Sequence, residues 1–123
     1  MFITRKYLRE NPDKVFVFGD NLLRKGKKGG AVLRDEPNTY GFVTKKAPNN
    51  LDSSFYRPSE YKEVFRHELN DLINVIEANP DKTFLISKIG SGLANKYNIF
   101  EKVIKPGLAK LKKYPNVEFL FKL

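Results

Sequence analysis

The stretch that decides the fold is a hydrophobic run ending in glycine, Val15-Phe16-Val17-Phe18-Gly19-Asp20-Asn21. Its β-branched and aromatic residues favour a buried strand, and Asn11-Pro12-Asp13 before it is typical of a turn. The chain then enters a first glycine-rich turn, Gly26-Lys27-Lys28-Gly29-Gly30-Ala31. Because glycine lets backbone N–H groups approach an anion closely, this turn is a candidate anion-binding loop.

A second strand and glycine turn follow later in the chain. The run Phe84-Leu85-Ile86-Ser87 leads into Lys88-Ile89-Gly90-Ser91-Gly92-Leu93-Ala94. Each turn alone is a weak signal, because neither matches the nucleotide-triphosphate loop G-x-x-x-x-G-K-[ST] or the dinucleotide pattern G-x-G-x-x-G. Glycine between a strand and a helix is also often required by backbone geometry alone. Two such turns on one sheet edge, however, could hold a diphosphate between them.

The remaining sequence alternates between expected strands and helices. Strands are predicted at Tyr40–Thr44, Thr83–Ser87 and Val117–Phe121, with Met1–Leu8 as a candidate edge strand. Helices are predicted from Gly29 to near Arg34, from an N-cap at Ser59 to Asn79-Pro80-Asp81, and across Ile99–Leu111 with a bend at Pro106. The segment Ala47–Pro58 is predicted to be a loop. This pattern predicts a single α/β domain over residues 1–123, with three α/β/α layers and a mixed, mostly parallel sheet.

Composition limits the chemistry. The chain has no cysteine and one histidine, His67, which excludes disulfides, thiol nucleophiles and multi-histidine metal sites, so we expect no metal and no cofactor. His67 lies off the apolar stripe of its predicted helix and is expected to face solvent. No segment approaches the roughly 20 apolar residues of a membrane span, and no secretory signal is recognisable, so we expect a cytoplasmic protein without a membrane partner. The net charge of +9 fits a nucleic-acid partner and a solvated lysine-rich surface equally well.

Three polar residues beside the predicted strand ends are candidates for chemistry. Asp20 and Asn21 could contact ribose hydroxyls or a base amine, although both are common turn residues by propensity alone. Lys45 follows the strand Tyr40–Thr44. A lysine in a partly desolvated pocket beside other cations has a lowered pKa and can attack a carbonyl-like carbon; the alternative is an exposed lysine among many.

Several segments resemble the macrodomain superfamily of ADP-ribose-binding modules. These segments occur in family order and are Gly29–Leu33, Phe42–Lys46, Ile89–Leu93 and its continuation to Glu101–Pro106. They are most similar to the lysine-dependent ADP-ribosyl glycohydrolases, the branch that includes the terminal ADP-ribose protein glycohydrolase and the DNA ADP-ribosyl glycohydrolase antitoxins. The opening Val15–Leu22 also resembles short phage and bacterial macrodomain-like proteins. The resemblance implies a macrodomain-like fold, with one loop around the distal ribose and the other around the diphosphate.

The resemblance also assigns roles to residues. It implies that Lys45 of the Thr44-Lys45 pair attacks the anomeric carbon of the distal ribose. Asn21 matches the family's first-loop asparagine, while Gly19-Asp20 matches a Gly-Asp pair that contacts adenine on an earlier strand, and one short segment cannot occupy both places. The implied ligand-binding residues are Asp20, Asn21, Gly29, Gly30, Ala31, Thr44, Ile89, Gly90, Ser91, Gly92 and Leu93.

At one position the sequence departs from the family pattern, and this departure affects which substrate is expected. The protein-directed enzyme carries a catalytic aspartate in Gly-x-Gly-Leu-Asp, where this chain has Ala94. The DNA-directed relatives also lack that aspartate and keep the lysine, so the pattern and the net charge favour modified nucleic acid over protein. Three hypotheses follow: an ADP-ribosyl glycohydrolase using Lys45, a non-catalytic ADP-ribose reader, and a small basic nucleic-acid-binding protein whose glycine turns are structural. The sequence makes no prediction of the oligomeric state.

Overall fold

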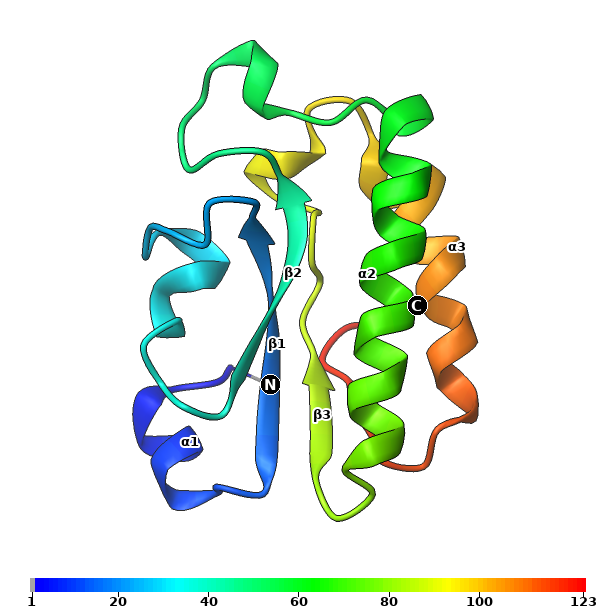
Figure 1. Cartoon of the computed structure of the whole chain (residues 1–123). Coiled ribbons are helices and arrows are strands. Elements are labelled where there is room, and N and C mark those ends of the chain that lie inside the picture. Colours follow the sequence, from blue (N-terminus) through cyan, green and yellow to red (C-terminus); the bar gives the residue numbers. More distant parts are fainter. Residues whose placement is uncertain (1) are drawn as a thin grey trace.

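The computed structural model describes residues 2–123, in which four strands form one parallel sheet (Figure 1). The strands are β1 (Lys14–Asn21), β2 (Thr39–Lys45), β3 (Thr83–Ile86) and β4 (Val117–Phe119). Their order across the sheet is β2-β1-β3-β4, and every pair is parallel. The predicted α/β class is therefore confirmed. Within the described residues the sheet itself is wholly parallel rather than mixed.

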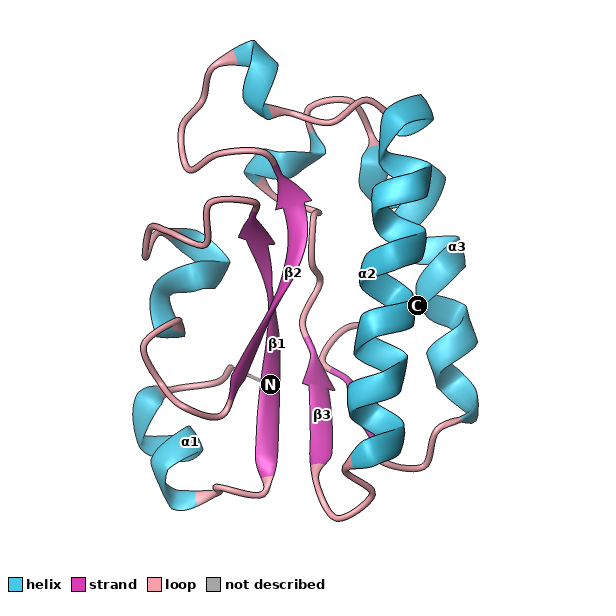
Figure 2. Cartoon of the chain, in the orientation of Figure 1, coloured by secondary structure: helices cyan, strands magenta, loops and turns pink. Residues whose placement is uncertain are grey.

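Helices cover both faces of this sheet (Figure 2). One face carries α2 (Pro58–Ala78) and a C-terminal helical segment made of a π-helical turn (Phe100–Ile104), α3 (Lys105–Leu108) and a 3₁₀ turn (Ala109–Lys113). The other face carries α1 (Arg5–Glu10) and a 3₁₀ helix (Gly29–Leu33). The chain moves from β1 to β2 in one direction across the sheet and from β2 to β3 in the opposite direction. Because crossovers between parallel strands are right-handed, the helices in these two connections lie on opposite faces of the sheet.

This topology creates a switch point between β1 and β3. The chain leaves β1 towards β2 on one side, and β3 and β4 are then added on the other side. In open parallel sheets, ligands bind beyond the carboxyl ends of the strands at such a point. The segments that follow β1 and β3 are the two glycine turns.

Alternation along the strands divides the core into two clusters. Val15 and Val17 of β1 face α2 and the C-terminal helical segment, whereas Phe16 and Phe18 face the side of α1. The apolar stripe of α2 is confirmed, because Tyr61, Phe65, Leu69, Leu72 and Ile76 are buried, with Val64 and Ile73 partly buried beside them. Within the described residues, no helix has both the length and the apolar character of a membrane span.

The predicted edge strand at Met1–Leu8 is wrong, and Met1 lies outside the described residues. Arg5–Glu10 forms helix α1, whose N-cap Thr4 accepts a hydrogen bond from the Tyr7 N–H at 3.0 Å. Arg5 and Arg9 each reach the buried carboxylate of Glu36 at 2.9 Å. These ion pairs hold α1 against the segment that follows the 3₁₀ helix, a contact that no local pattern in the sequence shows.

The other differences concern where elements begin and end. Helix α2 begins at Pro58 after an N-cap at Arg57, two residues earlier than the predicted cap at Ser59. Proline is well suited to the first helical position, and the Arg57 N–H donates to the Glu60 side chain at 3.0 Å. Strand β4 ends at Phe119 instead of Phe121. The predicted loop at Ala47–Pro58 contains one short 3₁₀ turn, Asp52–Ser54.

Candidate functional site

The two glycine turns meet at the carboxyl end of β1. A Cβ atom placed on Gly19 would lie 3.5 Å from the backbone N of Gly90 in the second turn and 3.3 Å from Oγ1 of Thr44. A Cβ atom placed on Gly30, in the first turn, would lie 3.9 Å from the backbone N of Gly19. Gly19 therefore lies between the two turns, and its missing side chain allows this close approach.

The glycines of the two turns have different roles. Gly90 has φ +73°, and a Cβ atom there would lie 2.3 Å from Cδ1 of the buried Ile104, so packing requires glycine. A Cβ atom on Gly29 or Gly92 would meet no atom within 4 Å. At these two positions the turns border open space, although the φ of +58° at Gly29 already favours glycine there.

Unpaired backbone donors lie beside this open space. Among residues 2–123, the backbone N–H groups of Gly29, Gly30, Gly92 and Leu93 donate no hydrogen bond. The N–H of Gly90 is also unpaired within that part of the chain, although Gly90 is buried. Since buried amides in folded proteins are nearly always paired, this N–H is a candidate donor to an anion at this edge of the sheet.

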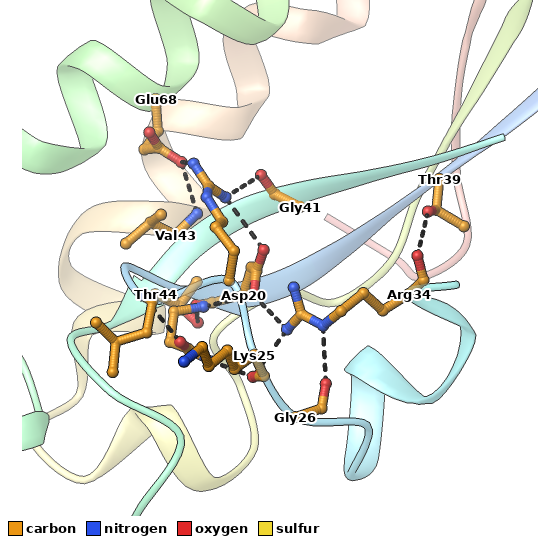
Figure 3. Close-up of polar contacts among 12 residues, drawn as sticks. Asp20, Lys25, Gly26, Arg34, Thr39, Gly41, Val43, Thr44 and Glu68 are labelled. Carbon is orange, nitrogen blue, oxygen red and sulfur yellow. Dashed lines mark hydrogen bonds and ion pairs between the residues drawn. The ribbon is translucent and has the colours of Figure 1, made fainter. Parts of the chain in front are cut away.

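Asp20 is fully engaged within the protein (Figure 3). Its carboxylate accepts hydrogen bonds from Arg34 at 2.5 Å, Arg24 at 3.1 Å and the Asn21 N–H at 2.8 Å. Burial alone would raise the pKa of Asp20, but the hydrogen bonds from Arg34, Asn21 and Arg24 hold this pKa below its ordinary value. Asp20 therefore anchors two arginines, and its oxygens are not free for a ligand.

The other polar side chains predicted to bind ligand also hold their own loops in shape. Asn21 donates from Nδ2 to the Lys25 carbonyl at 2.8 Å and accepts from the Leu23 N–H at 3.1 Å. The hydroxyl of Thr44 donates to the Asp20 carbonyl at 3.3 Å, and the hydroxyl of Ser91 donates to the Lys88 carbonyl at 2.6 Å. The free polar groups at this edge therefore belong to the backbone.

The three apolar residues predicted at the site separate into two groups. Ala31 and Ile89 are buried in the two core clusters, so they support the turns from beneath. Leu93 is 72% exposed and borders the open space beside Gly92. Ala94, where the protein-directed glycohydrolases carry an aspartate, is buried.

Lys45 ends β2, opposite Asn21 in the register of the sheet. Its amine donates to the Asn49 carbonyl at 2.7 Å and lies 4.8 Å from the centre of the Phe55 ring. Burial lowers the pKa of this amine, because desolvation disfavours the ammonium form. The structure thus places Lys45 beside the first turn in the sheet, with its amine against the segment that follows β2.

That segment, residues 46–58, is called the strap below. Its Asp52 binds Lys96 at 2.8 Å, also accepts a hydrogen bond from the hydroxyl of Tyr97, and lies 3.7 Å from Arg57. The amine of Lys96 lies 5.2 Å from the centre of the Phe55 ring, which also contacts Lys45. The strap therefore covers the Lys45 amine and is fastened by Asp52 to the residues that follow the second glycine turn.

A surface cavity of about 380 Å³ opens beside Asp20 on the face that carries α1. Its lining consists of Phe18, Asp20, Arg24, Arg34, Thr39, Tyr40 and Gly41. Arg34 links Asp20 to the carbonyls of Lys25 and Gly26, while Arg24 links Asp20 to the carbonyl of Gly41 and lies 4.0 Å from Glu68 (Figure 3).

Sequence reasoning missed the arginine cluster and the strap contacts. Arg24 was recognisable only as part of a basic run, and Asp52, Phe55 and Lys96 stand in segments without periodicity. The pairs Arg34–Asp20 and Asp52–Lys96 are separated by 14 and 44 residues, so no local spacing rule identifies them. Within the described residues, no group of three or more His, Asp or Glu side chains is arranged to hold a metal ion.

Comparison with curated proteins gives no match, and comparison with solved structures gives none either. A family model described as "Family of unknown function (DUF7831)" matches residues 1–97. The matched region includes both glycine turns, Lys45 and the strap, and ends before the C-terminal helical segment and β4. The model covers well over half of the chain, and the protein therefore belongs to the DUF7831 family.

Proposed function

We propose that the protein binds ADP-ribose at the carboxyl edge of the sheet, with the diphosphate between the two glycine turns. The observation that carries this proposal is the convergence of unpaired backbone amides from both turns at the switch point between β1 and β3. Amides fixed in place by a folded turn need no reorganisation when an anion arrives.

The space and charge at this edge fit a diphosphate. Gly29 and Gly92 border open space, so an anion can approach the backbone closely there. Lys27 and Lys28 of the first turn are exposed and add positive potential near the same amides. Among diphosphates, ADP-ribose is the choice that follows from the resemblance of both turns and the Thr44-Lys45 pair to macrodomains.

We extend the proposal to hydrolysis of ADP-ribose from a modified macromolecule, with Lys45 as nucleophile. The neutral amine would form a bond to the anomeric carbon of the distal ribose as the bond to the modified group breaks. The electron pair leaves with that group, which takes up a proton, and water then releases ADP-ribose from the lysine. The burial that lowers the pKa of Lys45 supports this role, because it increases the neutral fraction of the amine.

Further features of the chain bear on the choice of substrate and on the two alternative functions. Ala94 and the net charge of +9 favour modified nucleic acid over protein as the carrier of ADP-ribose. In the structure, the Lys45 amine is held by Asn49 and Phe55, an observation that favours a non-catalytic reader as the second candidate. A basic nucleic-acid-binding protein with purely structural turns is the third.

Binding is tested by titrating the protein with ADP-ribose in a calorimeter, with ribose 5-phosphate as a comparison ligand. Gly92→Ala is the informative variant, because its Cβ atom would enter the open space with no protein atom within 4 Å. We expect at least about tenfold weaker ADP-ribose binding by a variant that circular dichroism shows to be folded, since a ligand that loses close backbone contacts loses about 1.4 kcal/mol or more. Absence of binding to the unmodified protein at millimolar ADP-ribose would overturn the proposal.

Catalysis is tested with ADP-ribosylated single-stranded DNA and an ADP-ribosylated protein as substrates. Lys45→Ala should abolish release of ADP-ribose while retaining ADP-ribose binding. Lys46→Ala removes the same charge at the neighbouring position, where the amine binds Glu60 at 3.1 Å, and should retain turnover. Binding without turnover by the unmodified protein would identify a reader, and turnover that survives Lys45→Ala would exclude the lysine mechanism.

A further inference from the structure

A second surface cavity, of about 460 Å³, lies between α2 and the C-terminal helical segment. The two elements lie side by side on one face of the sheet (Figure 1). The cavity is lined by Lys62, Phe65, Arg66, Leu69, Asn70, Ile73, Lys102, Val103, Pro106, Gly107 and Lys110. None of these residues belongs to the glycine turns, Lys45 or the strap, so this groove is separate from the candidate site.

The groove is rimmed by positive charge without a matching negative charge. Four of its lining residues are cations, Lys62, Arg66, Lys102 and Lys110, and none is a carboxylate. Arg66 pairs with Glu63, which also lies 3.0 Å from His67. Within residues 2–123, Lys62, Lys102 and Lys110 form no ion pair. An anionic partner would relieve their mutual repulsion.

Between the cations the floor is apolar. Phe65, Leu69 and Val103 form its buried base, and its accessible apolar surface comes from the half-buried Ile73 and the exposed Pro106. A Cβ atom on Gly107 would lie 2.1 Å from Cε2 of Phe65, so glycine is required for the C-terminal segment to approach α2 this closely. The groove floor is therefore a packed, preformed surface.

The length of the groove matches a short helix. Its lining residues on α2 extend from Lys62 to Ile73, which corresponds to about 16 Å or three turns at the rise of an α-helix. A groove between two helices with an apolar floor is the usual receptor for an amphipathic helix that presents residues spaced three and four apart.

We propose that this groove binds an acidic amphipathic helix of about three turns from a partner protein. Its apolar side chains would cover the floor, and its carboxylates would face Lys62, Lys102 and Lys110. A nucleic-acid strand would neutralise these lysines but leave Ile73 and Pro106 in contact with water, and the only aromatic ring in the lining, Phe65, is buried and offers no face for base stacking. A second copy of the chain is disfavoured because each copy carries a net charge of +9.

The test uses a fluorescein-labelled 18-residue peptide of Leu, Glu and Ala, with Leu at alternating spacings of three and four, and measures fluorescence anisotropy. We expect saturable binding by the whole chain. The double variant K102E/K110E should weaken binding by about tenfold or more, because opposed charges become like charges. The double variant K6E/K122E makes the same change in net charge at exposed positions outside the groove and should leave affinity within about twofold, since only a screened long-range contribution changes.

Two further probes distinguish the source of affinity. A peptide in which Ser replaces every Leu should bind at least about tenfold more weakly, because the floor then gains no apolar contact. The proposal is overturned if the two double variants bind the first peptide equally, or if the Ser peptide binds as well as the Leu peptide. A third outcome also overturns it: the Leu peptide does not bind, whereas single-stranded DNA of equal charge binds and the K102E/K110E variant loses this DNA binding. Circular dichroism of each variant verifies that it is folded.

Discussion

Asp20 holds the first glycine turn in place by pairing with two arginines. Arg34 reaches from the end of the 3₁₀ helix to this carboxylate and to two carbonyls of the turn, and Arg24 connects it to β2. Gly41 makes the arrangement possible, because a Cβ atom there would lie 2.2 Å from Oδ2 of Asp20. A residue that sequence reasoning assigned to ligand binding thus has a structural role that is visible in the contacts.

We expect Asp20→Ala to lower the free energy of unfolding by about 2–4 kcal/mol, because it leaves Arg34 and Arg24 without their buried partner. The estimate lies below that for a fully buried pair because Arg24 is half-exposed. Urea denaturation measures the change. Asp35→Ala is the matched control, since Asp35 also pairs with two cations but at the surface, and it should cost only a small part of that loss. Equal losses for the two variants would contradict the role of burial.

The lowered pKa of Asp20 also implies that the stability of the fold depends on pH in the acid range. Hydrogen bonds from Arg34, Asn21 and Arg24 outweigh burial and lower the pKa of Asp20 in the folded state, and hydrogen bonds from Arg9 and then Arg5 lower that of Glu36. A lowered folded-state pKa contributes stability that is present above the unfolded-state pKa, about 4 for these groups, and is lost as the pH falls through the folded-state pKa.

Thermal unfolding from pH 7 to pH 2 measures this dependence. The unfolding temperature should be nearly constant above about pH 5 and fall steeply below about pH 4, where the unfolded state binds more protons than the folded state. In Asp20→Asn the fall should be shallower, because one of the carboxylates whose pKa is lowered in the folded state no longer titrates. An unchanged slope in Asp20→Asn would show that the linkage resides elsewhere.

At the scale of elements, the strap lies against the Lys45 amine. Asp52 fastens the strap to Lys96 and Tyr97, while Asn49 and Phe55 cover the Lys45 amine. The contacts of Asp52 are exposed at the surface, so the fastening is weak compared with a buried network. The strap can therefore open at modest cost, and its opening would free the amine.

We expect Asp52→Ala to speed modification of Lys45 by trinitrobenzenesulfonate several-fold at high pH, with the site located by mass spectrometry. Because burial lowers the pKa of Lys45, opening of the strap should also move the pH profile of its modification to higher pH. A merely destabilised fold would change the rate without this shift. Asp81→Ala removes an exposed carboxylate after α2, at the end of the sheet opposite the strap, and should leave both rate and profile unchanged. Identical profiles for the two variants would show that the strap does not govern Lys45.

Elements with strong periodicity could be predicted from the sequence, whereas contacts between irregular segments could not. The hydrophobic run from Val15 and the apolar stripe of α2 specify their structures locally, and both are present. Helix α1 is six residues long and depends on Glu36, more than 25 residues away, so local propensity misassigned it. The positions of the glycine turns could be predicted from the parallel topology. The engagement of Asp20 and Asn21 could not, because it depends on arginines and carbonyls brought together only by folding.

At the scale of the whole molecule, the C-terminal segment completes the core although the family model ends at residue 97. Ile99, Ile104, Leu108 and Leu111 are each 0% exposed in the larger core cluster. Ile104 also lies directly beneath Gly90, so this segment supports the second glycine turn as well as the sheet. Strand β4 pairs with β3 and forms one edge of the sheet.

We therefore expect a fragment of residues 1–97 to be unfolded. Burying four such side chains contributes about 6–12 kcal/mol, which is comparable to the entire stability of about 5–15 kcal/mol that small domains possess. The loss is compounded because α2 and β3 would expose the apolar surfaces that these side chains cover. Circular dichroism and heating should show little helix and no cooperative transition for the fragment, whereas residues 1–123 should unfold in one transition. A cooperative transition in the fragment would mean that the first 97 residues fold without the C-terminal helical segment, and the turns would then form independently of Ile104.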